Sequence, residues 1–461
     1  MIKSKVQNYQ IDSPLPVKIL YALLIINYCI YIPVSLFKSN VFLLIYDVLL
    51  ILMLLLTIAN KTVVKRIFNG KKVLLLLIVL YGVNLLIVTL LDFRSISIES
   101  IKTIRNLTYG LGIFIISSIW CNQKDYVNII IKILVVGSLI TGIYGFRQIL
   151  FGFMDFELDR LKLMGASFKE YEVLGRARMT SSFGDPLTCA FFMMVGYLAL
   201  FIAKSRGLLH YLTEKKRVYI SAAILIISLI LTLTRAPLFG LLVGSILIYP
   251  FYNWNNFRNI SGNIKYIIII LCVVFLVGGV SKSYVIDSSR NYHSSNIQKI
   301  TRHGVSSFIS IFQSFEAFDA NSKVDVILNQ SQRSRISSWG KAINYIRKNP
   351  FGGGLNNSSN YSYSLVDIGL LSYGIKSGMI GFLSMILILF YIGINYYRLT
   401  KAETDVVLRK ESYLYLSLWI AIIVTGLVSE ILQNSSISIV VWTIGGILTN
   451  YKRRVQNAFR Y

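Results

Sequence analysis

The sequence predicts an all-α polytopic membrane protein, with about twelve transmembrane helices and one large loop outside the cytoplasm. Three observations predict this fold class. The mean hydropathy is +0.62. Charged residues make up 15% of the 461 residues, against about 25% in soluble proteins. Runs of about 20 apolar residues, each long enough to cross a hydrocarbon layer of ~30 Å, recur along the chain. A single helical bundle over residues 1–461 is therefore expected.

The apolar runs define twelve expected spans, and an even number places both termini on the same side. No cleaved signal peptide is expected, because the first apolar run is too long for one and follows the polar stretch "MIKSKVQNYQIDSPLP". The spans are 17–37, 41–59, 73–91, 104–121, 127–150, 186–203, 218–234, 236–252, 265–281, 378–398, 412–428 and 435–450.

The distribution of basic residues predicts the orientation of the bundle. The segments "NKTVVKRIFNGKK", "KSRGLLHYLTEKKR" and "YKRRVQNAFR" fall on the same side as the N-terminus. Short loops rich in Lys and Arg stay in the cytoplasm, so both termini are expected there. The net charge of +26 is then a property of membrane loops, and no nucleic-acid partner is expected. Loops 151–185 and 282–377 face outward, where they would cover an active site on that side of the membrane.

Three arginines meet on the outward side in this topology. Arg178 precedes the sixth span, Arg235 follows the seventh in "LTLTRAPLFG", and Arg335 lies in the large loop. Guanidinium groups bind phosphate oxygens in bidentate fashion, so together these arginines predict a site for a lipid-linked phosphate or diphosphate. The alternative is that each arginine reaches the membrane interface and caps a helix end. Further candidate substrate contacts are Arg176, Arg333, Arg347, Tyr361 and Tyr363.

The large loop contains one expected amphipathic helix in "SRISSWGKAINYIRKNP". An apolar stripe of Ile336, Trp339, Ile343 and Ile346 recurs at helical spacing, and Asn349–Pro350 ends the pattern. A helix of this kind can lie along the membrane interface. The following "FGGGLNNSSNYSYS" is expected to be a flexible linker that could gate access to a site.

Asp367 is the candidate catalytic residue. It heads the apolar stretch "DIGLLSYGIKSGMIGF" at the outer membrane boundary. A poorly solvated carboxylate there is suited to accept a proton. Its other possible roles are a helix cap or a salt bridge to one of the arginines.

Neither a metal nor a nucleotide cofactor is expected. His210, His293 and His303 do not form a ligand set, and the four cysteines have no metal-like spacing. The acidic triplet Asp155, Glu157 and Asp159 could hold a divalent ion but more often faces solvent. No phosphate-binding glycine loop of the nucleotide type is present, so energy for a reaction would have to come from an activated substrate.

Four stretches in order resemble the O-antigen ligase/polymerase superfamily of bacterial membrane glycosyltransferases. They are "RMTSSFGDP", "LTLTRAPLFGLLVG", "RISSWGKAINYIRKNPFGGG" and "DIGLLSYGIKSGMIGF", and together they cover residues 178–382. The resemblance implies a GT-C-like helical bundle that transfers glycans from undecaprenyl diphosphate at the outer face of the bacterial plasma membrane. It also implies that Arg178, Arg235 and Arg335 hold the diphosphate and that no metal is needed.

One departure from the ligase pattern favours the polymerase branch. Ligases of this family carry a histidine eleven residues before the glycine that here is Gly378, and that position is Asp367. The sequence is therefore interpreted as a Wzy-type polymerase of surface polysaccharide such as O-antigen or capsule. Its donor and acceptor would be undecaprenyl-diphosphate-linked glycans, and membrane lipids and a chain-length regulator are its other expected partners. The alternatives are a ligase that moves a finished glycan to another acceptor and a flippase or exporter of anionic glycolipids.

Overall fold

The structure is a computed structural model, and every structural statement below concerns the residues that it describes. These are residues 13–29, 44–60, 72–91, 98–121, 123–158, 172–173, 176–210, 214–252, 337–354, 361, 368–403 and 405–449.

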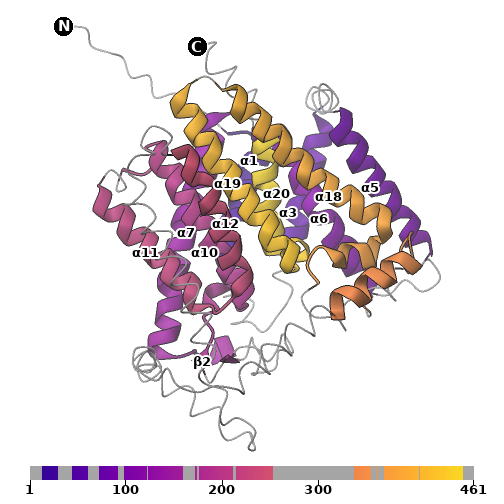
Figure 1. The fold of residues 1–461 in the computed structure, drawn as a ribbon, viewed down its shortest axis with the longest axis horizontal. Helices are drawn as coiled ribbons and strands as arrows, with labels where there is room; N and C mark the ends of the chain where they lie inside the picture. Colours follow the sequence, from indigo (N-terminus) through magenta and orange to yellow (C-terminus); the bar gives the residue numbers. More distant parts are fainter. Residues whose placement is uncertain are drawn as a thin grey trace, which may run out of the picture.

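The described part of the chain is a bundle of long helices (Figure 1). Each of these helices overlaps one expected span, while the ninth expected span, 265–281, lies outside the described residues. The bundle helices are α1 (Leu15–Cys29), α3 (Leu44–Ala59), α5 (Lys72–Leu91), α6 (Ile98–Trp120), α7 (Lys124–Phe151), α10 (Pro186–Ser205), α11 (Lys215–Leu231), α12 (Arg235–Tyr252), α18 (Leu371–Ala402), α19 (Val406–Val428) and α20 (Ser435–Thr449).

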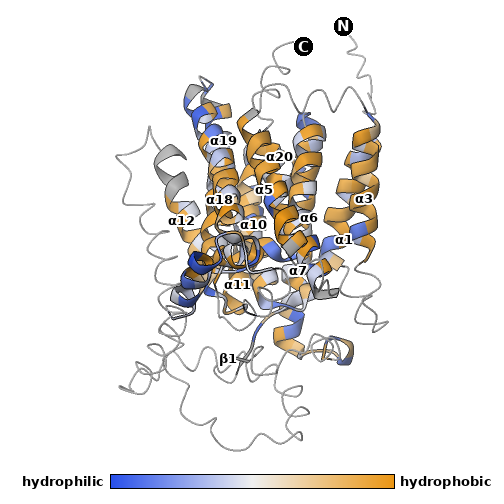
Figure 2. Ribbon diagram, turned by 90° about the vertical axis from the view of Figure 1, so that its right-hand side faces the viewer, coloured by the Kyte–Doolittle hydropathy of each residue, from blue (hydrophilic) through white to orange (hydrophobic). Residues whose placement is uncertain are grey.

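Five segments of these helices are long and apolar enough to cross a membrane: Val73–Leu90, Lys124–Phe151, Pro186–Ser205, Leu371–Lys401 and Leu408–Val428. Four further apolar helices are shorter. Figure 2 shows apolar residues along the length of the bundle helices. Large apolar side chains also cover outward faces, as at Leu76 and Leu86 of α5. Apolar surface on that scale fits lipid rather than water, so the chain is a polytopic membrane protein.

Hydrogen bonds between helix ends define two ends of the bundle. Asn27 Nδ2 donates to the carbonyl of Ser436 over 2.6 Å, and Tyr46 Oη donates to Asn27 Oδ1 over 3.1 Å. The end of α1 and the starts of α3 and α20 therefore lie together. We call this end the rim. The opposite end is marked by Trp120 Nε1, which donates to Thr57 Oγ1 over 3.0 Å.

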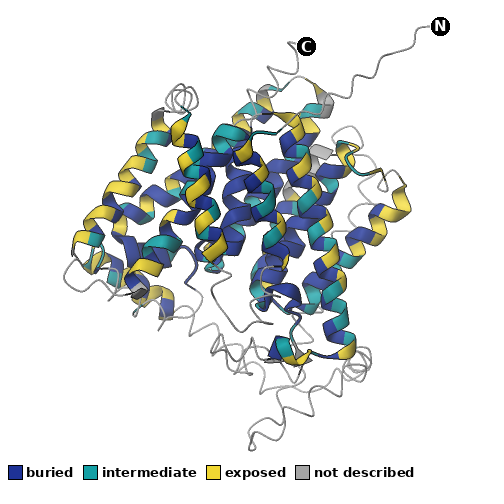
Figure 3. Cartoon of the chain, turned by 180° about the vertical axis from the view of Figure 1, so that it is seen from behind, coloured by how far each residue is buried: buried dark blue, intermediate teal, exposed yellow. Residues whose placement is uncertain are grey.

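Small residues allow α6 and α20 to pack with their backbones close together. A Cβ added at Gly110 would lie 2.1 Å from Trp442 Nε1, and one at Gly446 would lie 2.0 Å from Ser117 Oγ. Helices in lipid associate through close packing of this kind, because lipid tails are as apolar as the helices themselves. The centre of the bundle is consequently well buried, with exposed residues mainly on outward faces (Figure 3).

Short elements cover the rim. One antiparallel hairpin of β1 (Glu172–Val173) and β2 (Arg176–Ala177) precedes the 3₁₀ turn η3 (Ser181–Phe183), and a second 3₁₀ turn, η7 (Ile431–Gln433), connects α19 to α20. A helix over residues 337–348 lies ahead of α18. Apart from that hairpin, the described elements are helical, in agreement with the predicted fold class.

α18 differs from the expected span 378–398. It begins at Leu371, and Gly378 interrupts it with φ 70° and ψ −176°. Hydropathy alone missed the first two turns because they contain Ser372, Lys376 and Ser377. Gly378 permits the kink because residues other than glycine rarely adopt a positive φ.

Candidate functional site

Arg178 is anchored at the rim to the turn between α11 and α12. Its Nε donates to the carbonyl of Thr232 over 3.0 Å, and its Nη2 donates to Thr234 Oγ1 over 2.8 Å. The next backbone amide, of Met179, donates to the carbonyl of Leu231 over 3.1 Å. These contacts fix the guanidinium group of Arg178 beside the residue that precedes Arg235.

Arg235 is the first residue of α12 and is exposed. The turn that leads into it is tight, because Leu233 takes φ 53° and Thr232 Oγ1 bonds back to the carbonyl of Leu229 over 2.6 Å. The structure thus brings Arg178 and Arg235 to one turn, as the sequence predicts. Two permanent cations at the N-terminal end of a helix favour a bound anion, which the helix dipole also stabilises.

The packing of α12 against α19 sets the height of Arg235. A Cβ at Gly240 would lie 2.2 Å from Thr425 Oγ1, and one at Gly244 would lie 3.0 Å from the carbonyl of Ser417. The two helices therefore run antiparallel with close backbones. Arg235 lies about one helical turn beyond Gly240 on the side of the rim. It is therefore level with the end of α19, just before Glu430.

A buried lysine forms a second polar cluster at the rim. The side chain of Lys376 is 6% exposed. Its Nζ donates to Gln433 Oε1, and Gln433 Nε2 donates to Ser372 Oγ. Tyr373 Oη donates to the carbonyl of Leu432 over 3.1 Å. These bonds tie the start of α18 to η7. The sequence signal for this cluster was a lone lysine within an apolar stretch, a pattern that is often functional.

The turn after the helix 337–348 is seated on the kink of α18. The amide of Met379 donates to the carbonyl of Pro350 over 2.7 Å. Gly352 has φ 91° and lies against Gly378. The prediction of a flexible linker is therefore wrong for residues 351–354, which are the part of that stretch that the structure describes. Glycines with positive φ let this turn pack onto the α18 backbone.

The helix 337–348 packs on α18 by a different face from the predicted stripe. Ala342 and Ile346 are buried with Ile375 and Ile368 in a small apolar cluster. Trp339 and Ile343, which the periodicity placed beside Ile346, are 38% and 54% exposed. The stripe is divided because Ile346 turns toward Gly374, where an added Cβ would lie 2.4 Å from its Cδ1. Trp339 and Ile343 are left outward, where they can meet lipid.

The other predicted site residues have different outcomes. Arg176 contributes its backbone to β2, and Arg347 is exposed on the helix 337–348. Tyr361 stacks on Tyr345 with ring centroids 4.4 Å apart, so one face of its ring is covered. Four predicted residues lie outside the described part of the chain, and they are Asp367, Arg335, Arg333 and Tyr363.

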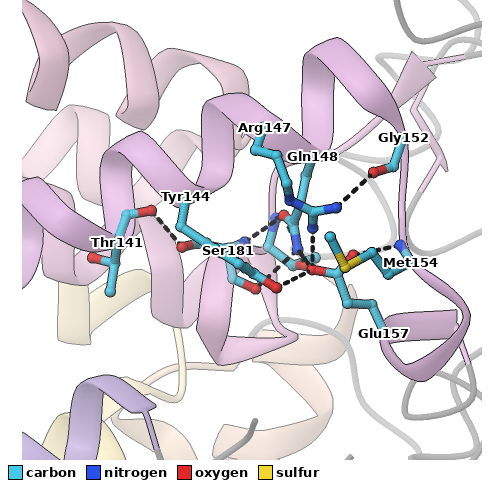
Figure 4. Close-up of polar contacts among 9 residues, drawn as sticks. Thr141, Tyr144, Arg147, Gln148, Gly152, Met154, Glu157 and Ser181 are labelled. Carbon is cyan, nitrogen blue, oxygen red and sulfur yellow. Dashed lines mark hydrogen bonds and ion pairs between the residues drawn. The ribbon is translucent and has the colours of Figure 1, made fainter.

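Glu157 is a rim residue whose role sequence reasoning missed. Its carboxylate accepts hydrogen bonds from Arg147, Gln148 and Tyr144, which are side chains of α7 (Figure 4). The acidic triplet thus supplies an ion pair, with Arg147 Nη2 and Glu157 Oε1 2.5 Å apart. Among the described residues no three His, Cys, Asp or Glu side chains gather as a metal site, and Asp159 of the triplet lies outside them.

The site therefore belongs to a polytopic membrane protein with paired arginines at one end of its helical bundle. Residues 220–383 match the family model described as O-antigen ligase. Over these residues the chain carries a domain similar to the O-antigen ligase family, in line with the resemblance of the sequence to the O-antigen ligase/polymerase superfamily. The domain runs from α11 through the kink of α18 and includes Arg235 and Lys376, whereas Arg178 precedes it. No curated protein sequence matches the chain.

Proposed function

We propose that the protein polymerises undecaprenyl-diphosphate-linked oligosaccharide repeat units into a surface polysaccharide at the outer face of the plasma membrane. The observation that carries the proposal is the contact of Arg178 with Thr232 and Thr234, which sets its guanidinium group on the turn that presents Arg235. Two permanent cations at the rim suit a diphosphate, whose negative charge grows as it leaves the donor sugar. The O-antigen ligase domain supports glycan transfer as the reaction.

In this mechanism Arg178, Arg235 and Arg335 bind the diphosphate of the donor, a growing chain on undecaprenyl diphosphate. A hydroxyl of the lipid-linked acceptor unit attacks the anomeric carbon, and Asp367 accepts the hydroxyl proton. The bond between the anomeric carbon and the diphosphate oxygen breaks, and its electron pair leaves with undecaprenyl diphosphate. A single displacement inverts the anomeric configuration. The activated donor supplies the energy, so the reaction needs neither a nucleotide nor a metal.

The acidic residue at Asp367, where the ligase pattern has histidine, favours chain polymerisation over transfer of a finished glycan. The runner-up function is ligation to another acceptor, which the same rim arginines would also serve. Transport of an anionic glycolipid is a weaker candidate, because a flippase would need its charges along a path through the bundle, whereas Arg178 and Arg235 lie at one end of it.

The test is an assay of the purified protein with its lipid-linked repeat unit, without nucleotide and with a chelator present. Polymerisation predicts a ladder of lipid-linked oligomers from the wild type and no ladder from Arg235→Ala. Transfer of a preformed chain to a second acceptor without a ladder would establish the ligase instead. Movement of the glycolipid across vesicle membranes without new glycosidic bonds would establish transport.

A further inference from the structure

The buried carboxylate of Glu157 holds together the chain segment that follows α7. The side chain of Glu157 is 8% exposed. Its Oε1 accepts from Tyr144 Oη over 2.6 Å and from Gln148 Nε2 over 2.8 Å, and it pairs with Arg147. Its Oε2 accepts from the amide of Met154 over 2.6 Å. A carboxylate with this many donors is fixed in place, so it is suited to orienting its neighbours rather than to reacting.

Gln148 connects Glu157 to the backbone segment that begins with Arg178, because its side chain bonds to both. Because an ionised carboxylate only accepts hydrogen bonds, Glu157 requires the amide nitrogen of Gln148 to face it. Gln148 Oε1 must then face the other way. There it accepts from the backbone amides of Ser181 over 2.7 Å and Thr180 over 3.3 Å (Figure 4).

The segment fixed by Gln148 is short and strained. Ser181 takes φ 51°, an uncommon conformation for a residue other than glycine. Its backbone carbonyl accepts from Gln148 Nε2 over 3.1 Å, and its hydroxyl donates to the carbonyl of Thr141. Strain of this kind persists only where surrounding contacts hold it. The contacts from α7 therefore determine the backbone path between Arg178 and Ser181.

The other end of that segment is joined to Arg235. Arg178 lies three residues before Ser181 and binds Thr232 and Thr234 on the turn into α12. Hydrogen bonds thus link Glu157 through Gln148 to Ser181. The backbone from Ser181 back to Arg178, and the bonds of Arg178 to Thr232 and Thr234, extend this link to the turn that carries Arg235. Glu157 and Gln148 act through this network on the backbone beside Arg178, and neither residue needs to reach a ligand for the network to act.

We propose that Gln148 and Glu157 are positioning residues that set the spacing of Arg178 and Arg235 for a diphosphate. This inference rests on the proposed function, which makes the arginine pair a diphosphate site. A purely structural role for the network is the alternative. A purely structural role predicts that the variants yield less folded protein. The folded protein would still have the wild-type ratio of affinities for diphosphate and monophosphate ligands.

The test compares the affinity of the full-length detergent-solubilised protein for undecaprenyl diphosphate and for undecaprenyl monophosphate. Gln148→Leu removes the bonds that orient the 178–181 segment, and Glu157→Gln replaces the carboxylate that orients Gln148 with a neutral amide of similar size. We expect each to weaken diphosphate binding by about 10- to 100-fold, with a smaller loss for the monophosphate. The milder Tyr144→Phe removes one bond to Glu157 and is expected to give a smaller loss of the same kind.

The matched control is Glu411→Gln, because Glu411 forms a buried ion pair with Arg206 at the opposite end of the bundle. It should lower the thermal midpoint without changing the ratio of the two Kd values. Equal changes of that ratio in Glu411→Gln and Glu157→Gln would overturn the positioning role, as would unchanged ratios in Gln148→Leu and Tyr144→Phe. Unchanged diphosphate binding in Arg178→Ala and Arg235→Ala would instead overturn the proposed diphosphate site, and the inference with it.

Discussion

Gly352 and Gly378 meet backbone to backbone at the rim. A Cβ added at Gly378 would lie 2.4 Å from the amide nitrogen of Gly352, and both residues have a positive φ. The turn after the helix 337–348 is thereby seated on the kink of α18. Only residues without side chains permit this approach, which fixes one element of the large loop on the membrane bundle.

Gly378→Ala should separate these two elements. Alanine at φ 70° is strained, and its methyl group would overlap the backbone of the turn 350–352. We expect a loss of stability of about 1–3 kcal/mol, read as a lower thermal midpoint in detergent. The control is Gly340→Ala, since a Cβ at this helical position meets nothing within 4 Å. It should be neutral or stabilise by about 0.5–1 kcal/mol, and equal midpoints for the two variants would contradict the packing argument.

Arg235→Ala should lower kcat/KM for glycan transfer by about 10²–10³-fold, because the proposed mechanism assigns Arg235 to the leaving diphosphate. Arg235→Lys should recover part of the rate, because lysine keeps the charge but lacks the planar fork. Initial rates with the lipid-linked repeat unit measure both. Arg217→Ala is the matched control, since Arg217 pairs with Glu214 in an exposed salt bridge at the start of α11. A comparable loss in that variant would show that general charge, rather than the position of Arg235, matters.

The sequence predicted the bundle well because membrane crossing depends on the hydropathy of each segment by itself. It also placed Arg178 and Arg235 together, since helices that alternate across a membrane return to the same side. The features that the sequence did not predict are contacts between residues that lie apart in the chain. Glu157 appeared as one acid of a triplet until the structure placed Arg147 and Gln148 beside it. Lys376 was not singled out from the sequence, because its acceptor, Gln433, lies far along the chain.

The bond between Lys376 and Gln433 yields a prediction about the stability of the rim. Lys376→Met should destabilise the protein by about 1–3 kcal/mol, because Gln433 loses a partner in a buried setting. Gln433→Leu should do the same. The double variant should be less destabilised than the sum of the two, with a coupling energy of about 0.5–3 kcal/mol. Thermal or denaturant unfolding of the four proteins measures this cycle, and simple additivity would mean that the bond contributes little.

Asp367→Asn tests the proposed proton acceptor. Asparagine keeps the size of the side chain but does not accept a proton from the acceptor hydroxyl. The rate of glycan transfer should fall by about 10²–10⁴-fold, while Kd for undecaprenyl diphosphate stays unchanged, because the proposed mechanism assigns binding of that group to the arginines. Single-turnover rates and equilibrium binding measure the two quantities separately.

The control for this variant is Asp125→Asn, which changes an exposed carboxylate in the first turn of α7, far from the rim. Its transfer rate should equal that of the wild type. If Asp367→Asn also transfers glycan at the wild-type rate, another group must accept the proton. Glu430 would then be the next residue to replace, because the antiparallel packing of α12 and α19 brings it to the level of Arg235.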